Sequence, residues 1–135
     1  MGGRLYAIGG QRRHDTDPVD LDVVHAYDPA RDTWTAVASL PTPRSHFEAS
    51  TFVHDGRIVI LGGRNNTRWR PLNRVALANV TTYDPATNTW TELPALPMAL
   101  QSTCGQLIDG RLIVTNGCVM DGVAGQTRTF LADFR

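Results

Sequence analysis

The strongest constraint on this chain is an internal repeat, because a sequence that copies itself at a fixed period folds as a series of similar units. The segment GRLYAIGG, residues 3–10, recurs as GRIVILGG at 56–63 and, more loosely, as GRLIVTNG at 110–117. A second block, YDPARDTWT at 27–35, recurs as YDPATNTWT at 83–91. Both blocks share nearly the same offset, so the repeating unit is a whole supersecondary motif.

Each period consists of short β-branched and apolar runs separated by turn signals, with no helical periodicity. Asp55-Gly56 suits a type I′ hairpin turn, because both residues tolerate positive φ, and Pro85 blocks further ladder pairing after Asp84. The fold class predicted is therefore all-β, built of β-propeller blades that are four-stranded antiparallel meanders. The four strands expected in the clearest unit are Phe47–His54, Arg57–Leu61, about Ala78–Tyr83, and about Thr89–Leu93.

These motifs resemble the kelch family, whose blades carry a diglycine after the second strand, then Tyr-Asp-Pro, then a Trp near the start of the fourth strand. We expect the glycines to let an aromatic ring lie against the backbone, since they lack a Cβ. The third unit departs from the pattern, with Asn116 in place of the first glycine and no Tyr-Asp-Pro or Trp block. The matching motif residues are Gly9, Gly10, Tyr27, Trp34, Gly62, Gly63, Tyr83 and Trp90.

The repeat divides residues 1–135 into one partial kelch-type propeller with blade pieces at about 1–43, 44–97 and 98–135. We expect three, four and three strands in these pieces. The resemblance implies a closed ring with more blades than this. We therefore expect a fragment of a longer propeller; the alternatives are a ring completed by self-association and a misassigned start at Met1.

In a meander, the loops between blades and the loops after each second strand lie on the same face. The long loops, about Gln11–Leu21, Arg64–Leu77 and Cys118–Thr127, are all on that face. The resemblance implies that this face binds a ligand, with contacts from the start of the first strand and the beginning of the long loop. On this sequence those positions are His46, Ser102, Arg64 and Asn66. The alternative is that His46 and Ser102 only satisfy backbone groups.

The long loops differ in charge. One contains Asp15, Asp17, Asp20 and Asp22, and the next contains Arg64, Arg68, Arg70 and Arg74. One hypothesis is that Arg64, Arg68 and Arg70, with Trp69 between the last two, bind an acidic peptide or an acidic sugar through forked hydrogen bonds and stacking. The alternative is that the loops neutralise one another or are simply solvated.

Several functional classes are disfavoured. Thirteen acidic and thirteen basic residues give no net charge, which argues against nucleic acid and anionic membranes as partners, and no apolar run is long enough to span a bilayer. The acidic loop lacks the glycine and distal glutamate of a calcium-binding loop, so no metal or other cofactor is expected. The hairpin at Asp109-Gly110 places Cys104 opposite Thr115 and Cys118 near Gln101, so both cysteines are predicted to be free.

The sequence therefore predicts a binding or scaffolding module that contacts a protein or peptide through the long-loop face and has no catalytic residues. The rival is a piece of a propeller enzyme, because galactose oxidase and the sialic-acid epimerase have folds similar to kelch proteins. Copper chemistry is not supported, since Tyr6, Tyr27 and Tyr83 all occupy repeated structural positions. A third hypothesis is a carbohydrate-binding propeller that stacks a sugar on Trp69. The compartment stays open.

Overall fold

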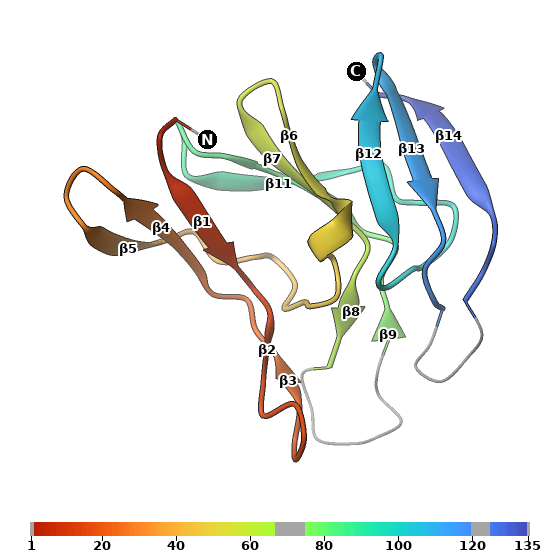
Figure 1. Ribbon diagram of the computed structural model, residues 1–135, viewed down its shortest axis with the longest axis horizontal. Helices are drawn as coiled ribbons and strands as arrows, with labels where there is room; N and C mark the ends of the chain where they lie inside the picture. Colours follow the sequence, from red (N-terminus) through yellow and green to blue (C-terminus); the bar gives the residue numbers. More distant parts are fainter. Residues whose placement is uncertain (1, 67–74, 120–124, 135) are drawn as a thin grey trace.

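The computed structural model describes residues 2–66, 75–119 and 125–134, and its three main sheets follow one another along the chain (Figure 1). All three are antiparallel, and we call them the first, second and third blades. The first contains β1 (Leu5–Ile8), β4 (Val24–Asp28) and β5 (Thr33–Val37). The second contains β6 (Thr51–His54), β7 (Arg57–Leu61), β10 (Val80–Asp84) and β11 (Thr89–Leu93). The third contains β12 (Cys104–Ile108), β13 (Arg111–Thr115) and β14 (Thr129–Asp133).

The all-β, propeller-type prediction is confirmed, and β7 and β11 have the predicted bounds. The turn between β6 and β7 has positive φ at both Asp55 (45°) and Gly56 (68°), as expected for that hairpin. None of the helices in the described part of the chain has the length and apolar character needed to cross a bilayer.

One predicted strand is wrong in its first half, because Phe47–His54 does not begin as a strand. A short 3-10 helix, η1 (Glu48–Ser50), follows Phe47, and the strand starts at Thr51. The Ser50 hydroxyl donates to the carbonyls of Phe47 (3.1 Å) and Leu61 (2.7 Å), and the Ser50 amide also donates to Phe47. A serine side chain that bonds nearby backbone carbonyls stabilises a turn in place of a ladder.

The long loops begin as two-stranded ribbons rather than as irregular coil. β2 (Gln11–Arg12) pairs with β3 (Val19–Asp20), and β8 (Arg64–Asn65) pairs with β9 (Val75–Ala76). Both ribbons point towards one end of the molecule, whereas the tight turns β6–β7 and β12–β13 lie at the other end (Figure 1). The long loops and the blade connections therefore share one face, as the meander predicted.

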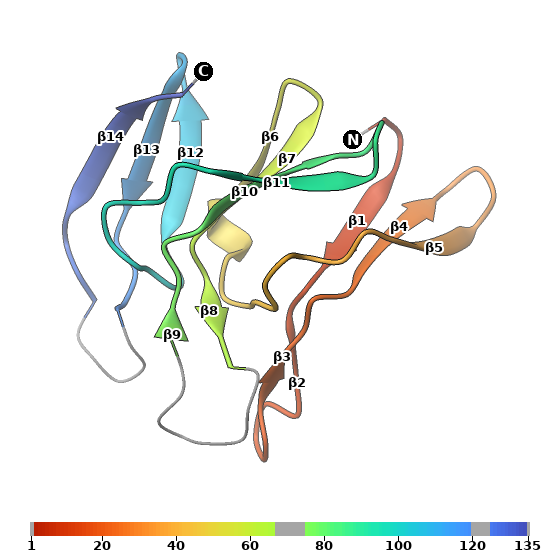
Figure 2. The same cartoon turned by 180° about the vertical axis from the view of Figure 1, so that it is seen from behind.

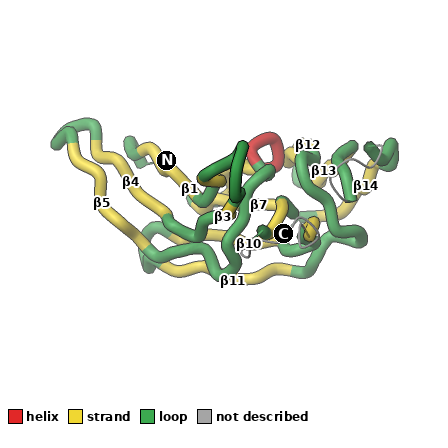
Figure 3. Tube along the Cα trace, turned by 90° about the horizontal axis from the view of Figure 1, so that it is seen from below, coloured by secondary structure: helices red, strands yellow, loops and turns green. Residues whose placement is uncertain are grey.

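The second blade lies between the other two, and each of its faces is covered by a neighbour (Figure 2). Because side chains alternate along a strand, Ile58 and Ile60 face the first blade while Val59 and Leu61 face the third. β7 is thus buried on both faces. Figure 3 shows the same order from below, with β4 and β5 at one end and β13 and β14 at the other. The two apolar cores are Val24, Leu40, Phe47, Ile58, Ile60 and Tyr83 at the first interface, and Phe52, Val59, Leu61, Val80, Leu96, Leu100, Leu112 and Val114 at the second.

The diglycines let the backbone of the next blade connection approach closely. A Cβ on Gly9 would clash with the carbonyl of Arg44, and one on Gly62 would clash with the carbonyl of Leu100. The next residue of each pair, Gly10 and Gly63, donates its amide to that same carbonyl, at 3.0 and 2.8 Å. The expectation that the glycines make room for an aromatic ring holds at Gly63, where a Cβ would lie 3.4 Å from the Phe47 ring, but not at Gly9 and Gly62, where the connection into the next blade lies against the glycine.

The repeated tyrosine and tryptophan pack on each other across neighbouring strands. The ring centroids are 5.0 Å apart for Tyr27 and Trp34, and 4.9 Å apart for Tyr83 and Trp90. Only the second pair is covered by another blade, because the Trp90 indole N–H donates to the carbonyl of Ala38 at 2.8 Å. Trp34 has 55% of its surface exposed. The same motif thus seals one blade interface and lies open at the outer face of the first blade.

Candidate functional site

The predicted ligand-binding residues that the structure describes lie at the end of the molecule that carries the two ribbons. We call this surface the loop face; it comprises the β2–β3 and β8–β9 ribbons and residues 43–46, 101–103 and 116–119. Isolated bridges tie the blade connections to the long loops, pairing Ser45 with Arg64 and Gln101 with Cys118. Cys104 lies opposite Thr115, and both cysteines are free, as predicted.

Asp20 lies at the centre of a polar network under the loop face. Its carboxylate is buried and accepts hydrogen bonds from the Ser45 hydroxyl (2.6 Å) and the Gln11 amide (3.0 Å). Arg64 Nε lies 3.8 Å from the other carboxylate oxygen. A buried carboxylate is tolerated only when it is paired and hydrogen-bonded, so these contacts hold the first ribbon, the second ribbon and the blade connection in one arrangement.

Arg64, predicted to contact a partner, is 4% exposed and forms an ion pair with Asp20. For these two residues the neighbouring loops do neutralise each other, which was the alternative interpretation of the opposite loop charges. Arg64 therefore acts first on the geometry of the loop face. The other predicted contacts in this loop, Arg68, Trp69 and Arg70, lie outside the described residues.

The structure brings His46 and Ser102 together, although they come from different blades. Both have positive φ, 60° and 50°, and the Ser102 amide donates to the His46 carbonyl at 2.8 Å. His46 Nδ1 lies 2.7 Å from the Ser45 hydroxyl, and the Ser102 side chain is exposed. The His46 carbonyl and the Ser102 amide thus satisfy each other, while the imidazole is half-buried and the serine side chain is exposed at the loop face.

Asn66 connects the two ribbons. Its side-chain amide donates to the Pro18 carbonyl at 2.7 Å, and its own carbonyl accepts from the Asp20 amide at 3.0 Å. The side-chain oxygen of Asn66 is buried and has no hydrogen-bond partner among the described residues. Asn66 therefore fixes the spacing between the first and second long loops.

The arrangement of the Asp20 network differs from that of a hydrolase triad. Its order is Asp20–Ser45–His46, with the hydroxyl in the middle, whereas a hydrolase triad places the imidazole between serine and carboxylate. Ser45 is also buried, at 2% exposure. Within residues 2–66, 75–119 and 125–134, no group of three or more His, Cys, Asp or Glu side chains is arranged to hold a metal ion.

Apolar surface lies next to these polar groups. Val75, which pairs with Asn65 across the second ribbon, is 57% exposed, and Val119, directly after Cys118, is 41% exposed. Single exposed apolar side chains are ordinary on protein surfaces, and these two lie beside hydrogen-bonding groups. The loop face therefore combines a rigid polar base with exposed donors, acceptors and apolar groups.

Sequence reasoning missed Ser45 and Gln11, and it treated Asp20 only as a loop charge. One local signal was available for Asp20. It comes shortly before β4, which begins at the buried Val24, so Asp20 lies close to the core along the chain. The contact with Ser45 joins residues 25 apart in the chain, and no local pattern specifies it.

Comparison with known proteins gives a consistent result. The family model described as Kelch motif matches residues 1–41 and 46–97. Human Kelch-like protein 33 is 33% identical over 117 residues, which cover 87% of this chain and 20% of that protein. An F-box/kelch-repeat protein of Arabidopsis thaliana is 37% identical over 95 residues, covering 70% of this chain and 23% of that protein. Kelch-like ECH-associated protein 1A of Danio rerio is 28% identical over 113 residues, covering 84% and 17%.

Among solved structures, that of YjhT superposes with a TM-score of 0.81 at 19% identity, covering 98% of this chain and 46% of that one. At this identity the likeness concerns the fold alone. The chain spans about a fifth of the length of these three relatives.

Proposed function

The chain belongs to the kelch family, and on that premise we propose that it is a binding module that holds a protein partner against its loop face, without catalysis of its own. The observation that supports this proposal is the buried network around Asp20. In this network a carboxylate, a guanidinium and two side-chain amides hold the two long loops in place. His46 stays partly exposed, and Ser102 and Val75 are exposed. A rigid base under an exposed mixed surface lowers the entropy cost of binding.

The relatives support a protein as the partner. Their names combine kelch repeats with other modules, as in the F-box/kelch-repeat protein and in the human Kelch repeat and BTB domain-containing protein 13. One is named as an associated protein, the Kelch-like ECH-associated protein 1A. These names describe those proteins, and they favour an interaction module over an enzyme for this chain.

For the partner's chemistry we infer an acidic peptide segment. Arg64 is already engaged by Asp20, so the positive charge available to a partner comes from Arg68 and Arg70, with Trp69 between them in the sequence. A guanidinium binds a carboxylate through two parallel hydrogen bonds, and an indole adds contact area. In this proposal Arg64 and Asn66 position the loop, and Arg68, Trp69 and Arg70 contact the peptide together with His46 and Ser102.

The test is binding of the purified chain to arrays of acidic, neutral and basic peptides. The double variant Arg68→Glu with Arg70→Glu should weaken binding to acidic peptides at least about tenfold, because hydrogen bonds to charged groups are worth roughly 1.5–3 kcal/mol each. The matched control is Arg31→Glu with Arg111→Glu, which makes the same change in charge at two exposed positions at the other end of the molecule, in the β4–β5 turn and at the start of β13. Equal weakening by both would indicate a general charge effect and would contradict the proposal.

A glycan array, run in parallel, separates the carbohydrate hypothesis. Binding of sugars that is lost in Trp69→Ala, with no binding of peptides, would replace the proposed protein partner by a carbohydrate. Binding of acidic peptides that survives the double arginine variant would leave the module proposal intact and move the contact to another part of the loop face.

A further inference from the structure

A chain of three hydrogen-bonded side chains connects the buried base of the loop face to its surface. Asp20 and Ser45 are each 2% exposed, whereas His46 is half-buried. Oδ1 of Asp20 lies 2.6 Å from the Ser45 hydroxyl oxygen, and the same hydroxyl oxygen lies 2.7 Å from Nδ1 of His46. The imidazole at the loop face is thus connected to a buried carboxylate through one hydroxyl group.

The protons of this chain can be assigned, because a hydroxyl group has a single proton to donate. Oδ1 of Asp20 also accepts from the Gln11 side-chain amide at 3.0 Å, and Nε of Arg64 lies 3.8 Å from Oδ2. Both carboxylate oxygens therefore face donors, and the Ser45 hydroxyl donates to Asp20. The hydroxyl must then accept from His46, so Nδ1 of His46 carries a proton.

The charged form of this imidazole fits the network without rearrangement. Nδ1 is a donor in the neutral ring and stays a donor in the charged ring, so the second proton adds to Nε2 and the bond to Ser45 is kept. Asp20 then lies one hydroxyl away from a positive ring. An opposite charge nearby favours the charged form of a titratable group.

Among the described residues, few other charged groups lie beside His46. On β8, Arg64 is paired with the buried carboxylate, so these two charges offset each other beneath the loop face. Along its own segment, Arg44 is buried and directed at backbone carbonyls, and Glu48 is exposed. The third blade contacts this histidine through residues 101–103, which contain no charged side chain. A proton gained by the ring therefore adds a net positive charge to the loop face.

We propose that the loop face takes up a proton at His46 when it binds an acidic peptide, so that binding is tighter at lower pH. Ser45 and Asp20 act as positioning residues, because they keep the Nδ1 proton in place and favour the positive ring. This inference rests on the function proposed above. A ligand that favours the protonated form must itself be bound more tightly by that form, since the two equilibria are linked. Histidine titrates between about pH 5 and 8, so the change falls near physiological pH.

The proton assignment is tested by nitrogen-15 NMR of the imidazole ring, without any peptide. At pH 8 the His46 signals of the purified chain should show the proton on Nδ1. In Ser45→Ala this preference should be lost, and the midpoint of the His46 titration should move to lower pH by at least about half a unit, because the link to the carboxylate is removed. Thermal melts followed by circular dichroism establish that the variant is folded, and the spectrum of the unmodified chain tests the assignment by itself.

Fluorescence anisotropy tests the coupling to binding. A rhodamine-labelled peptide of alternating glutamate and glycine, and its glutamine counterpart, are titrated with the purified chain at pH 5.5 and pH 8. The glutamate peptide should bind about three- to fivefold more tightly at pH 5.5, as for a partly exposed ion pair, and the glutamine peptide should not. His46→Gln should remove the pH dependence. The matched control His14→Gln, in the exposed first long loop, should keep it.

The proposal is overturned if the glutamate peptide binds equally well at both pH values, or if His14→Gln removes the pH dependence as completely as His46→Gln. A proton on Nε2 of neutral His46 in place of Nδ1 would also overturn it, whatever the peptide does. Failure of the glutamate peptide to bind at either pH is a different result, because it would contradict the acidic partner proposed for the loop face and the proton uptake together.

Discussion

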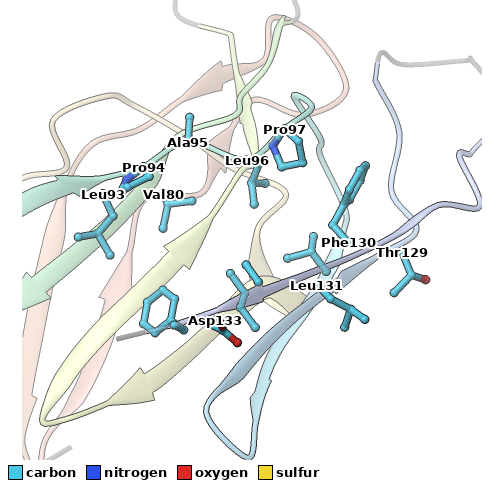
Figure 4. Close-up of a pocket in the computed structure, with 14 residues that line it drawn as sticks. Val80, Leu93, Pro94, Ala95, Leu96, Pro97, Thr129, Phe130, Leu131 and Asp133 are labelled. Carbon is cyan, nitrogen blue, oxygen red and sulfur yellow. The ribbon is translucent and has the colours of Figure 1, made fainter.

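The two blade interfaces are made from the same repeat, yet one is full and the other contains a cleft. At the first interface Tyr83 and Trp90 fill the space between blades, with Tyr6 meeting Tyr83 edge-on at 5.9 Å between ring centroids. At the second interface Ala132 lies where the tyrosine does, the described residues include no strand at the position of β11, and a cleft of about 640 Å³ lies beside β14 (Figure 4). The comparison teaches that the buried side chains of β7 form the core of both interfaces, and that the aromatic pair on the two outer strands β10 and β11 completes the first one.

The two interfaces also differ at the buried residue that precedes the first strand of the later blade. Arg44 and Leu100 occupy equivalent positions, where their carbonyls face Gly9 and Gly62, and both are fully buried. The Arg44 guanidinium reaches the carbonyls of Gly62 (3.4 Å) and Thr42 (3.5 Å), and burial lowers the pKa of Arg44. Leu100 instead belongs to the apolar core of the second interface. The first interface thus contains a buried cation beside its aromatic pair, whereas the second has a leucine at the position of the arginine and Phe52 as its buried aromatic residue.

The largest expected effect comes from making the first interface resemble the second. Tyr83→Ala should lower the free energy of unfolding by about 3–5 kcal/mol, because it removes a buried ring and leaves a cavity. The matched control is Tyr27→Ala, at the same repeat position on the outer face of the first blade, which should cost about 1 kcal/mol. Urea unfolding followed by circular dichroism measures both. Equal losses would show that the aromatic pair acts within its own blade and does not seal the interface.

A smaller effect isolates the polar part of the same interface. Asn88→Gly should cost about 2 kcal/mol, because the Ala38 amide and the Tyr83 hydroxyl each lose their acceptor. Glycine keeps the positive φ of 55° at this position without strain. The matched control is Asp32→Gly, where φ is 49° and the side chain accepts only from the Tyr27 hydroxyl at the open face.

The difference between the two glycine variants is the result that matters. If Asp32→Gly costs as much as Asn88→Gly, the bond across the blade interface contributes nothing beyond the local turn. If Asn88→Gly costs more, the difference in the free energy of unfolding reports the hydrogen bond from the Ala38 amide to Asn88 across the blade interface.

Much of the fold could be predicted because it depends on local patterns. The Asp55-Gly56 turn and the bounds of β7 and β11 follow from turn chemistry and from runs of β-branched residues. The start of β6 could not be predicted in this way, because η1 depends on the bond from Ser50 to Leu61, on the neighbouring strand. A single side chain reaching across the sheet overrides the propensity of the segment around it.

The candidate site, too, has a part that could be predicted from the sequence and a part that depends on distant contacts. Meander geometry predicted that the long loops and the blade connections share one face, and the family resemblance singled out His46, Ser102, Arg64 and Asn66 on it. The burial of Arg64 against Asp20 could not be derived, because it depends on how the two ribbons meet and on the Ser45 hydroxyl between them. The pairing of Ala132 with Leu112 could not be derived either, since it depends on the register of β14 and no repeat motif marks that strand.

The smallest expected effect concerns the Tyr-Asp-Pro turns, which the first and second blades share although their outer faces differ. The Asp84 pKa lies below its ordinary value of 3.8, chiefly because the Ala86 amide donates to the carboxylate at 2.9 Å and also because Arg57 lies beside it. The Asp28 pKa is lowered by the hydrogen bond from Arg31 and then by the Ala30 amide.

A carboxyl group whose pKa is lower in the folded state stabilises the fold above its unfolded pKa, near pH 4, and loses that contribution as the pH falls through the folded value. Asp84→Asn and Asp28→Asn should therefore each reduce the difference between the urea midpoints at pH 6 and pH 3, by similar small amounts. Because both carboxylates lie at the surface, their effect belongs to the turn and not to the blade interface. A clearly larger change for Asp84→Asn would mean that the sealed interface stiffens the turn beside it, and would extend the contrast between the two blades from packing to electrostatics.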